Sequence, residues 1–333
     1  MGGTGSAEEE LAQRAGVPFV GVPAGGVHGL APWRAARNLV KLMQGVLAAL
    51  RLAGRRRPQA LFVTGGYASV PVALAAWLKR VPILVYLPDI EPGLAVRFIA
   101  RLATRVALTT EQSRAFFPPH KSVVTGYPVR PELTQWTRKA ARGALGLETE
   151  RPVLLVYGGS HGARSINQAT VRALTTLLEE TQVVHVTGHL DWPWVAEQAG
   201  RLPAALRAAY HPFEYLHEMG AALAAADLAV SRAGASVLGE LPAVGLPAVL
   251  VPYPHAWRYQ RVNAEWLVSR GVAVLLTDER LEQELTPTVL GLLRDPERLT
   301  AMRRRMQALA RPDAAQGLAA QLRSLVGKEE EGA

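Results

Sequence analysis

Glycine and hydroxyl residues follow an apolar run in the segment VLLVYGGSHGARSINQ, residues 153–168. Gly158, Gly159 and Ser160 come directly after the apolar residues, and a helical pattern begins soon afterwards. Glycines let a backbone approach a ligand closely, and the N–H groups at a helix start carry partial positive charge. The segment therefore suits a diphosphate, although it lacks the lysine of a P-loop and departs from the G-x-G-x-x-G spacing of dinucleotide sites. A tight turn between a strand and a helix, without a ligand, is the alternative interpretation.

A second turn of small residues, SRAGAS at 231–236, is followed by Glu240. Small residues again open the start of a helix to a ligand, and a carboxylate such as Glu240 can accept hydrogen bonds from two ribose hydroxyls. Polar side chains of the kind that bind sugar hydroxyls follow the next apolar run, at His255, Arg258, Gln260 and Asn263. Polar residues at a helix start can equally be capping or surface groups.

The first half of the chain carries a third glycine turn, TGGYAS at 64–69, and two carboxylates in the segment LPDIEPG at 87–93. Asp89 and Glu91 come at the end of a predicted strand, where either could act as a general base toward a hydroxyl. Their D-x-E spacing also permits a metal site, but we find no third ligand, and the histidines show no ligand spacing. We expect no metal.

Short apolar runs alternate with longer segments rich in alanine, leucine and arginine, which is typical of βα units and parallel sheets. At roughly 150 residues per domain, 333 residues suggest two domains. We predict an α/β protein of two Rossmann-like domains, 1–140 and 151–312, with a linker in the polar segment 137–151. The expected strands are residues 18–22, 60–64, 82–87, 106–109, 122–125, 153–157, 182–187, 228–231, 248–251 and 273–276.

Composition and charge limit the compartment in which the protein works and the kinds of partner that it binds. The absence of cysteine excludes disulfides and favours a reducing cytoplasm, and the N-terminal residues lack the pattern of a signal peptide. No apolar run reaches the roughly 20 residues that span a bilayer. Between residues 11 and 89 there are ten basic residues and one acidic residue, so this part should attract an anionic membrane surface. We expect no nucleic acid, because aromatic residues are few there.

The helix expected over residues 31–53 has an apolar stripe and precedes the basic triplet at 55–57. This combination is compatible with binding to a membrane surface. Packing of the stripe against a core, with the basic residues simply solvated, is the alternative.

Six segments together resemble the MurG-type glycosyltransferases of family 28, in the order and approximate spacing of that family. The resemblance implies the GT-B fold: two Rossmann-like domains with parallel sheets and a final helix, here 313–328, that returns to the first domain. It also implies an inverting, metal-independent hexosyltransferase without a cofactor, peripheral on the cytoplasmic face of the membrane. Such enzymes transfer N-acetylglucosamine from UDP-N-acetylglucosamine to undecaprenyl-linked muramyl-pentapeptide pyrophosphate in peptidoglycan synthesis. The segments are GGYAS from residue 65, GYPVR from 126, GGSHGARSIN from 158, YLHEM from 215, SRAGASVLGEL from 231 and GLPAVLVPYPHAWRYQRVNA from 245.

The resemblance also implies roles for single residues. Backbone groups of Leu216 would bind uracil and Glu240 would hold the ribose. Ser160 and Arg130 would neutralise the diphosphate, and Gln260 with Asn263 would face the transferred sugar. The other matched positions are Gly159, Arg232 and Ala235 for the donor, and Gly66, Tyr67 and Ser69 for the acceptor.

The sequence departs from the family pattern at three places. The family's first strand and its glycine loop ending in histidine are not found, so we expect that the chain starts late relative to its family. The H-E-Q-N segment of the acceptor side is replaced by residues 87–90, and Tyr127 and Tyr259 replace an asparagine and a glutamine. Because carboxylates stand where the usual polar residues are missing, our hypothesis is that Asp89 or Glu91 supplies the base.

Four other functions remain open from the residues. One is transfer to another glycolipid acceptor, and one is epimerisation of a UDP-sugar. A non-catalytic UDP-sugar-binding homologue is the third. A nucleotide-dependent oxidoreductase is disfavoured, because the glycine spacing does not fit.

Overall fold

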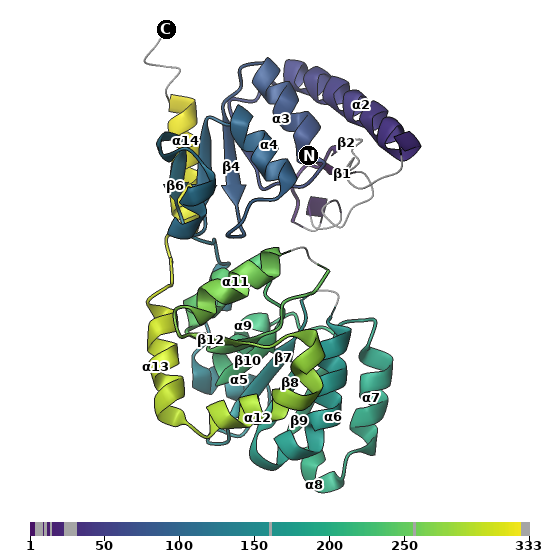
Figure 1. Cartoon of the computed structure of the whole chain (residues 1–333), viewed down its shortest axis with the longest axis vertical. Coiled ribbons are helices and arrows are strands. Elements are labelled where there is room, and N and C mark those ends of the chain that lie inside the picture. The colour runs from purple at the N-terminus through teal and green to yellow at the C-terminus, as the bar shows by residue number, and fades with distance from the viewer. Residues whose placement is uncertain are drawn as a thin grey trace. The chain divides into compact units, whose positions relative to one another are not determined.

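The computed structural model describes residues 1–3, 9, 12–13, 15–22, 32–159, 162–255 and 258–327 (Figure 1). The chain divides into two compact units, of which unit 1 comprises Met1–Gly126 with Asp313–Ala333 and unit 2 comprises Tyr127–Pro312. The division falls at Gly126 and at Pro312, whereas the sequence analysis placed the first boundary between residues 140 and 151.

Unit 2 contains a six-stranded parallel sheet with the order β12-β11-β10-β7-β8-β9. The chain adds β8 and β9 on one side of β7, and then returns to add β10, β11 and β12 on the other side. This reversal creates a crevice at the carboxyl ends of β7 and β10, the usual position of a ligand in an open α/β sheet. The strands are β7 (Val153–Tyr157), β8 (Gln182–Val186), β9 (Tyr210–Phe213), β10 (Leu228–Ser231), β11 (Ala248–Leu250) and β12 (Ala273–Leu275).

Helices cover both faces of this sheet, as parallel strands require. The strand β7 is buried along its whole length, and Leu154 and Val156 pack in one core with Ile166 and Leu177 of α6. The helices are α5 (Arg138–Ala144), α6 (Arg164–Glu180), α7 (Trp192–Arg201), α8 (Ala204–Arg207), α9 (Met219–Ala225), α10 (Glu240–Val244), α11 (Tyr259–Val268), α12 (Leu281–Leu293) and α13 (Pro296–Gln307). Three short 3-10 helices are η3 (Pro131–Leu133), η4 (Ala235–Leu238) and η5 (Asp278–Arg280).

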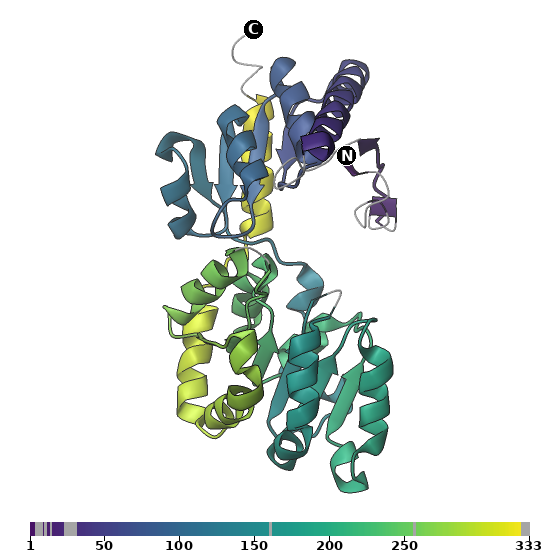
Figure 2. The ribbon, with the colours of Figure 1, turned by 45° about the vertical axis from the view of Figure 1, so that its right-hand side comes forward.

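Unit 1 contains a four-stranded parallel sheet, β3-β4-β5-β6, and a separate parallel pair of β1 (Gly2–Gly3) and β2 (Gly21–Val22). Alternate residues of β4 face two cores. Val85 packs with helices α3 and α4, whereas Leu84 and Tyr86 pack with Leu318 and Leu325 of α14, on the other face (Figure 1). The long helix α2 lies against α3 (Figure 2). The bounds are β3 (Leu61–Val63), β4 (Ile83–Leu87), β5 (Arg105–Leu108), β6 (Ser122–Val124), α2 (Pro32–Arg56), α3 (Ser69–Leu78), α4 (Leu94–Leu102), η1 (Glu111–Phe116), η2 (Pro119–Lys121) and α14 (Ala314–Val326).

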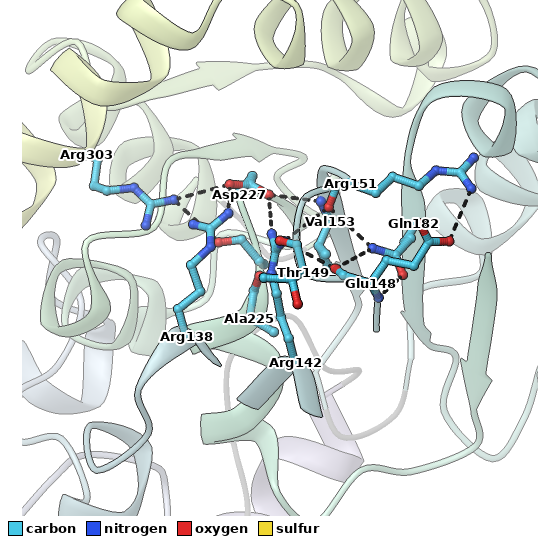
Figure 3. A network of polar contacts seen from close by, with 11 residues as sticks. Arg138, Arg142, Glu148, Thr149, Arg151, Val153, Gln182, Ala225, Asp227 and Arg303 are labelled. Atoms are coloured by element: carbon cyan, nitrogen blue, oxygen red, sulfur yellow. Dashed lines mark hydrogen bonds and ion pairs between the residues drawn. The ribbon is translucent and has the colours of Figure 1, made fainter. Parts of the chain in front are cut away.

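The segment predicted as a linker, residues 137–151, is instead part of unit 2. Arg142 of α5 is buried, and its guanidinium donates to the Asp227 carboxylate at 2.8 Å and to the Ala225 carbonyl at 3.2 Å (Figure 3). The same guanidinium donates to the carbonyls of Glu148, Thr149 and Arg151. A buried cation is tolerated when its donors are all engaged in this way. The polar composition of the segment therefore reflects this network rather than a solvated connection.

Candidate functional site

A cavity of about 910 Å³ lies in unit 2 at the carboxyl ends of β7 and β10. Its volume is within the range of sites for ligands of the size of a nucleotide. The turns after β7, β8, β10 and β11 form its walls, together with residues from α6, α11 and η5. The lining residues are Tyr157, Gly158, Gly159, Gly162, Ala163, Arg164, Ser165, Gln168, Leu190, Asp191, Arg232, Gly234, Ser236, Val237, Tyr253, Pro254, His255, Gln260 and Asp278.

The glycine turn after β7 has a backbone course that other residues could not follow. Gly159 and Gly162 have φ angles of 83° and 77°, in the left-handed region. A Cβ atom on Gly162 would lie 2.1 Å from the carbonyl oxygen of Thr187, and one on Gly158 would lie 2.3 Å from the nitrogen of Ala163. Close packing within the protein requires glycine at Gly158 and Gly162, whereas the sequence suggested glycine for the approach of a ligand.

The helix α6 begins directly after this turn, and its first residues line the cavity. Ala163 occupies the N-cap position and has no side-chain acceptor for the first amides. The first N–H groups of a helix have no partner within the helix and carry partial positive charge. This end of the cavity is therefore suited to an anionic group. The predicted Ser160 lies outside the described residues.

Arg232 lines the cavity, but its guanidinium is held by neighbours within the wall. It pairs with Asp278 at 2.8 Å and donates to Ser165 Oγ at 2.7 Å. Its Cζ atom lies 5.2 Å from the ring centroid of Tyr253. These contacts fix Arg232 as part of the wall, so it contributes charge to the cavity with a fixed orientation.

Gln260 lines the cavity, whereas Asn263 does not. The Gln260 carbonyl oxygen accepts from the backbone N–H of Tyr253 at 2.9 Å and of Ala233 at 3.3 Å, which fixes the direction of its amide. Asn263 is fully buried and donates to the carbonyl of Ala233 at 3.1 Å. Its amide thus holds the turn after β10 and is not part of the cavity wall, and its contact with a sugar stays a prediction.

Glu240 is the first residue of α10, and burial raises its pKa, although Ser236 and Arg130 act in the opposite direction. Arg130 is exposed and does not line the cavity. Burial likewise raises the pKa of Tyr157, and the Glu240 carboxylate adds to this shift. The ring of Tyr127 packs so closely on Gly239 that a Cβ there would lie 2.5 Å from it.

Three further predicted positions lie outside the cavity wall, and several residues of the wall were not predicted. Leu216, Ala235 and Glu240 are not in the cavity wall. Ala235 begins η4, and the next two residues of that helix, Ser236 and Val237, do line the cavity. Among the residues of the wall that were not predicted are Ser165 of α6, Asp191 of the turn after β8 and Asp278 of η5. A carboxylate four residues after the predicted strand 182–187 was the available signal for Asp191.

The predicted catalytic and acceptor-side residues all lie in unit 1. Glu91 follows β4 and pairs with Arg97 at 3.4 Å, and Asp89 lies two residues earlier, partly buried. In the turn before α3, Gly66 has a φ of 82°, Tyr67 is exposed, and the Ser69 hydroxyl donates to the carbonyl of Gly65. Both groups follow the carboxyl ends of neighbouring strands, β3 and β4.

Within the residues that the structure describes, no group of three or more histidine and acidic side chains could hold a metal ion. A search of the same residues finds no helix with the length and apolarity that a membrane span needs.

Comparison with known proteins gives consistent matches along the chain. Residues 1–108 match the glycosyltransferase family 28 N-terminal domain and residues 153–318 match its C-terminal domain. One relative, the UDP-N-acetylglucosamine–N-acetylmuramyl-(pentapeptide) pyrophosphoryl-undecaprenol N-acetylglucosamine transferase of Roseiflexus sp., is 44% identical over 98% of this chain and 83% of its own length.

Solved structures share the fold. The crystal structure of MurG from Acinetobacter baumannii has a TM-score of 0.77 at 24% identity, covering 97% of this chain and 89% of that one. A UDP-GlcNAc 2-epimerase from Neisseria meningitidis, bound to UDP-GlcNAc, has a TM-score of 0.65 at 13% identity, covering 95% and 88%. The GT-B architecture of two parallel-sheet domains is therefore confirmed, and the chain belongs to glycosyltransferase family 28.

Proposed function

We propose that the protein transfers N-acetylglucosamine from UDP-N-acetylglucosamine to undecaprenyl-linked muramyl-pentapeptide pyrophosphate. The observation that carries the proposal is the cavity of unit 2, which has the start of α6 at one end and Gln260 in its wall. The family membership and the name of the Roseiflexus relative support the choice of donor and acceptor.

In the proposed reaction, the acceptor hydroxyl oxygen forms a bond to the anomeric carbon while the bond from that carbon to the β-phosphate oxygen breaks. The configuration at the anomeric carbon inverts. The leaving UDP gains negative charge, which the amides of the Gly158 turn and the start of α6 stabilise. The proton of the acceptor hydroxyl passes to a carboxylate, for which Asp89 and Glu91 are the candidates.

Recognition of the donor is assigned to four residues of unit 2. Glu240 accepts hydrogen bonds from the ribose hydroxyls, and backbone groups of Leu216 bind uracil. The Gln260 carbonyl is occupied by backbone N–H groups, so its NH₂ is the part that binds a sugar oxygen. Arg130 provides further positive charge near Glu240.

We also propose that unit 1 binds the cytoplasmic face of an anionic membrane. Val40, Met43 and Leu47 of α2 are exposed, and so are Trp77 and Leu78 of the neighbouring α3. Apolar side chains with flanking cations are typical of helices that lie on a membrane surface. The exposed cations nearby in the sequence are Lys41, Arg51, Arg55, Arg56, Arg57, Lys79 and Arg80.

The test is the release of UDP from UDP-N-acetylglucosamine, measured with and without the undecaprenyl-linked acceptor, in buffer containing EDTA. The proposal predicts UDP release and labelled glycolipid in equal amounts, only when the acceptor is present. Formation of the C2 epimer of the donor without acceptor would contradict it in favour of an epimerase. Binding of the donor without turnover would show a non-catalytic homologue.

A further inference from the structure

A buried chain of hydrogen bonds runs through unit 2 behind the glycine turn. It connects Tyr210 of β9, His185 of β8 and Asn167 of α6 to the turn after β8. None of these three side chains lines the cavity, and His185 and Asn167 are fully buried. Burial of so many polar groups is costly unless each contact is made.

Asn167 is the centre of this chain. Its Nδ2 donates to the Thr187 carbonyl at 2.9 Å and to the Asp191 carboxylate at 2.8 Å. Its Oδ1 atom lies 3.0 Å from Nε2 of His185. Because both amide hydrogens of Asn167 are used, its oxygen must be the acceptor in the contact with His185.

The state of His185 follows from these contacts. Its Nε2 carries the hydrogen that Asn167 accepts, so Nδ1 accepts from the Tyr210 hydroxyl at 2.9 Å. Burial lowers the pKa of His185 to about 3, although Asp191 acts in the opposite direction. The ring is therefore neutral and has a single tautomer at neutral pH.

Asn167 donates to the Thr187 carbonyl and to the Asp191 carboxylate, and these two groups contact the glycine turn and the start of α6. The Thr187 carbonyl is the atom that approaches Gly162 so closely that only glycine fits there. The Asp191 carboxylate accepts from Nε of Arg164 at 2.8 Å, at the first residue of α6. Burial raises the pKa of Asp191, but its bonds to Asn167, Trp194 and Arg164 outweigh this and lower the pKa overall, so the carboxylate stays charged.

We infer that Asn167 and His185 are positioning residues for the donor site: through Thr187 and Asp191 they hold the glycine turn and the start of α6 in the geometry that binds the diphosphate. This inference rests on the proposed function, since it assumes that a nucleoside diphosphate occupies the cavity. Asn167 and His185 thus affect the binding of the donor although neither lines the cavity.

The experiment is calorimetric titration of the full-length protein and its variants with UDP. Asn167→Asp keeps the size and the acceptor but removes both donors, and it should weaken UDP binding about tenfold, as loss of a buried hydrogen bond predicts. His185→Leu should weaken binding comparably. His185→Gln keeps a donor for Asn167 and should restore UDP affinity to within about twofold of the wild type, a difference of under about 0.5 kcal/mol.

Leu174→Ala is the matched control, because Leu174 is buried on the same helix as Asn167 and takes no part in the chain of hydrogen bonds. It should lower the unfolding temperature and leave UDP affinity unchanged. A second readout is ¹⁵N NMR of His185, which should show the Nε2–H tautomer in the wild type and also in Asn167→Asp, because the carboxylate of that variant still accepts the Nε2 hydrogen.

The outcomes separate the inference from the proposed function. If the wild type binds UDP and Asn167→Asp binds it equally well, or if Leu174→Ala loses as much affinity, the positioning role is wrong and the proposed function stands. If the folded wild type binds no UDP, both are wrong.

Discussion

Glu240 has the most informative environment of the single residues. It begins α10 in unit 2, and the ring of Tyr127 packs on the preceding Gly239. Burial raises its pKa, while Ser236 and Arg130 partly oppose this effect. Because its pKa is raised, Glu240 keeps its proton up to a higher pH than an ordinary glutamate. Only the deprotonated carboxylate accepts hydrogen bonds with both oxygens.

Replacing Glu240 by glutamine should therefore reduce the preference for ribose. The wild type should bind UDP about tenfold more tightly than 2′-deoxy-UDP, the value of one hydrogen bond to a charged group, and Glu240→Gln should bind both alike. As the pH falls, the wild-type preference should decline at a higher pH than an ordinary glutamate allows, because the pKa is raised. Glu265→Gln, at an exposed position of α11, should change neither affinity. A preserved preference in Glu240→Gln would contradict the ribose role.

The proposed base can be tested by single substitutions in unit 1. Asp89→Asn or Glu91→Gln should lower kcat roughly 100-fold or more, the usual contribution of a general base, while UDP affinity is unchanged because donor binding belongs to unit 2. Glu111→Gln, an exposed partner of Arg114, is the control. Transfer at the wild-type rate in the double variant would eliminate both carboxylates as the base.

The positions of single residues were predictable where the backbone dictates them. Gly158 and Gly159 could be recognised because a close approach of the backbone needs glycine, and both line the cavity. Asn263 could not be placed, because the periodicity of a helix does not show whether a polar side chain faces a ligand or the turn beneath it. Ser165 and Asp278 were missed, because their contact joins residues far apart in the sequence.

At the scale of elements, the apolar runs predicted ten strands, and each overlaps an observed strand. The two-residue strand β1 and the strand β9 (Tyr210–Phe213) were missed. The strand β9 contains Pro212 and lies at the edge of the sheet, where proline is tolerated but the sequence pattern is weak. The linker prediction over 137–151 was wrong, because amino-acid composition does not distinguish a buried arginine such as Arg142 from a solvated one.

The glycine turn allows a sharp test at this scale. Gly162→Ala places a Cβ against the Thr187 carbonyl in a left-handed backbone conformation, which costs on the order of 1–3 kcal/mol in strain. UDP affinity should fall at least about tenfold. Gly200→Ala, on α7 with open space around it, should leave affinity unchanged and stabilise slightly, since alanine favours a helix. Equal UDP affinity in Gly162→Ala would show that the turn does not contact the ligand.

At the scale of the whole molecule, charge is divided between the halves of the chain. Residues 1–150 carry 19 lysine and arginine against 9 acidic residues, and residues 151–333 carry 18 against 19. This asymmetry could be read from the sequence. Which apolar side chains remain exposed beside the cations depends on the packing of α2 against α3, which the sequence could not give.

The exposed apolar and basic side chains of α2 and α3 predict that the protein binds an anionic membrane. The protein should cosediment with vesicles containing anionic lipid, and less at high salt because exposed charges are screened. Met43→Glu or Leu47→Glu should reduce the bound fraction severalfold, because each removes apolar area and adds repulsion. Gln44→Glu adds the same charge on α2 at an exposed polar position and should reduce binding less. Equal effects of the three variants would show that the apolar side chains do not insert.

Calorimetric comparison of UDP with uridine tests the central claim most directly, because the two ligands differ only in the diphosphate. We predict that UDP binds with one site per chain and that uridine binds at least about 100-fold more weakly, a difference of about 2.7 kcal/mol. Equal affinities, or no binding of UDP to the folded protein, would contradict the assignment of the glycine turn and the start of α6 to the donor diphosphate.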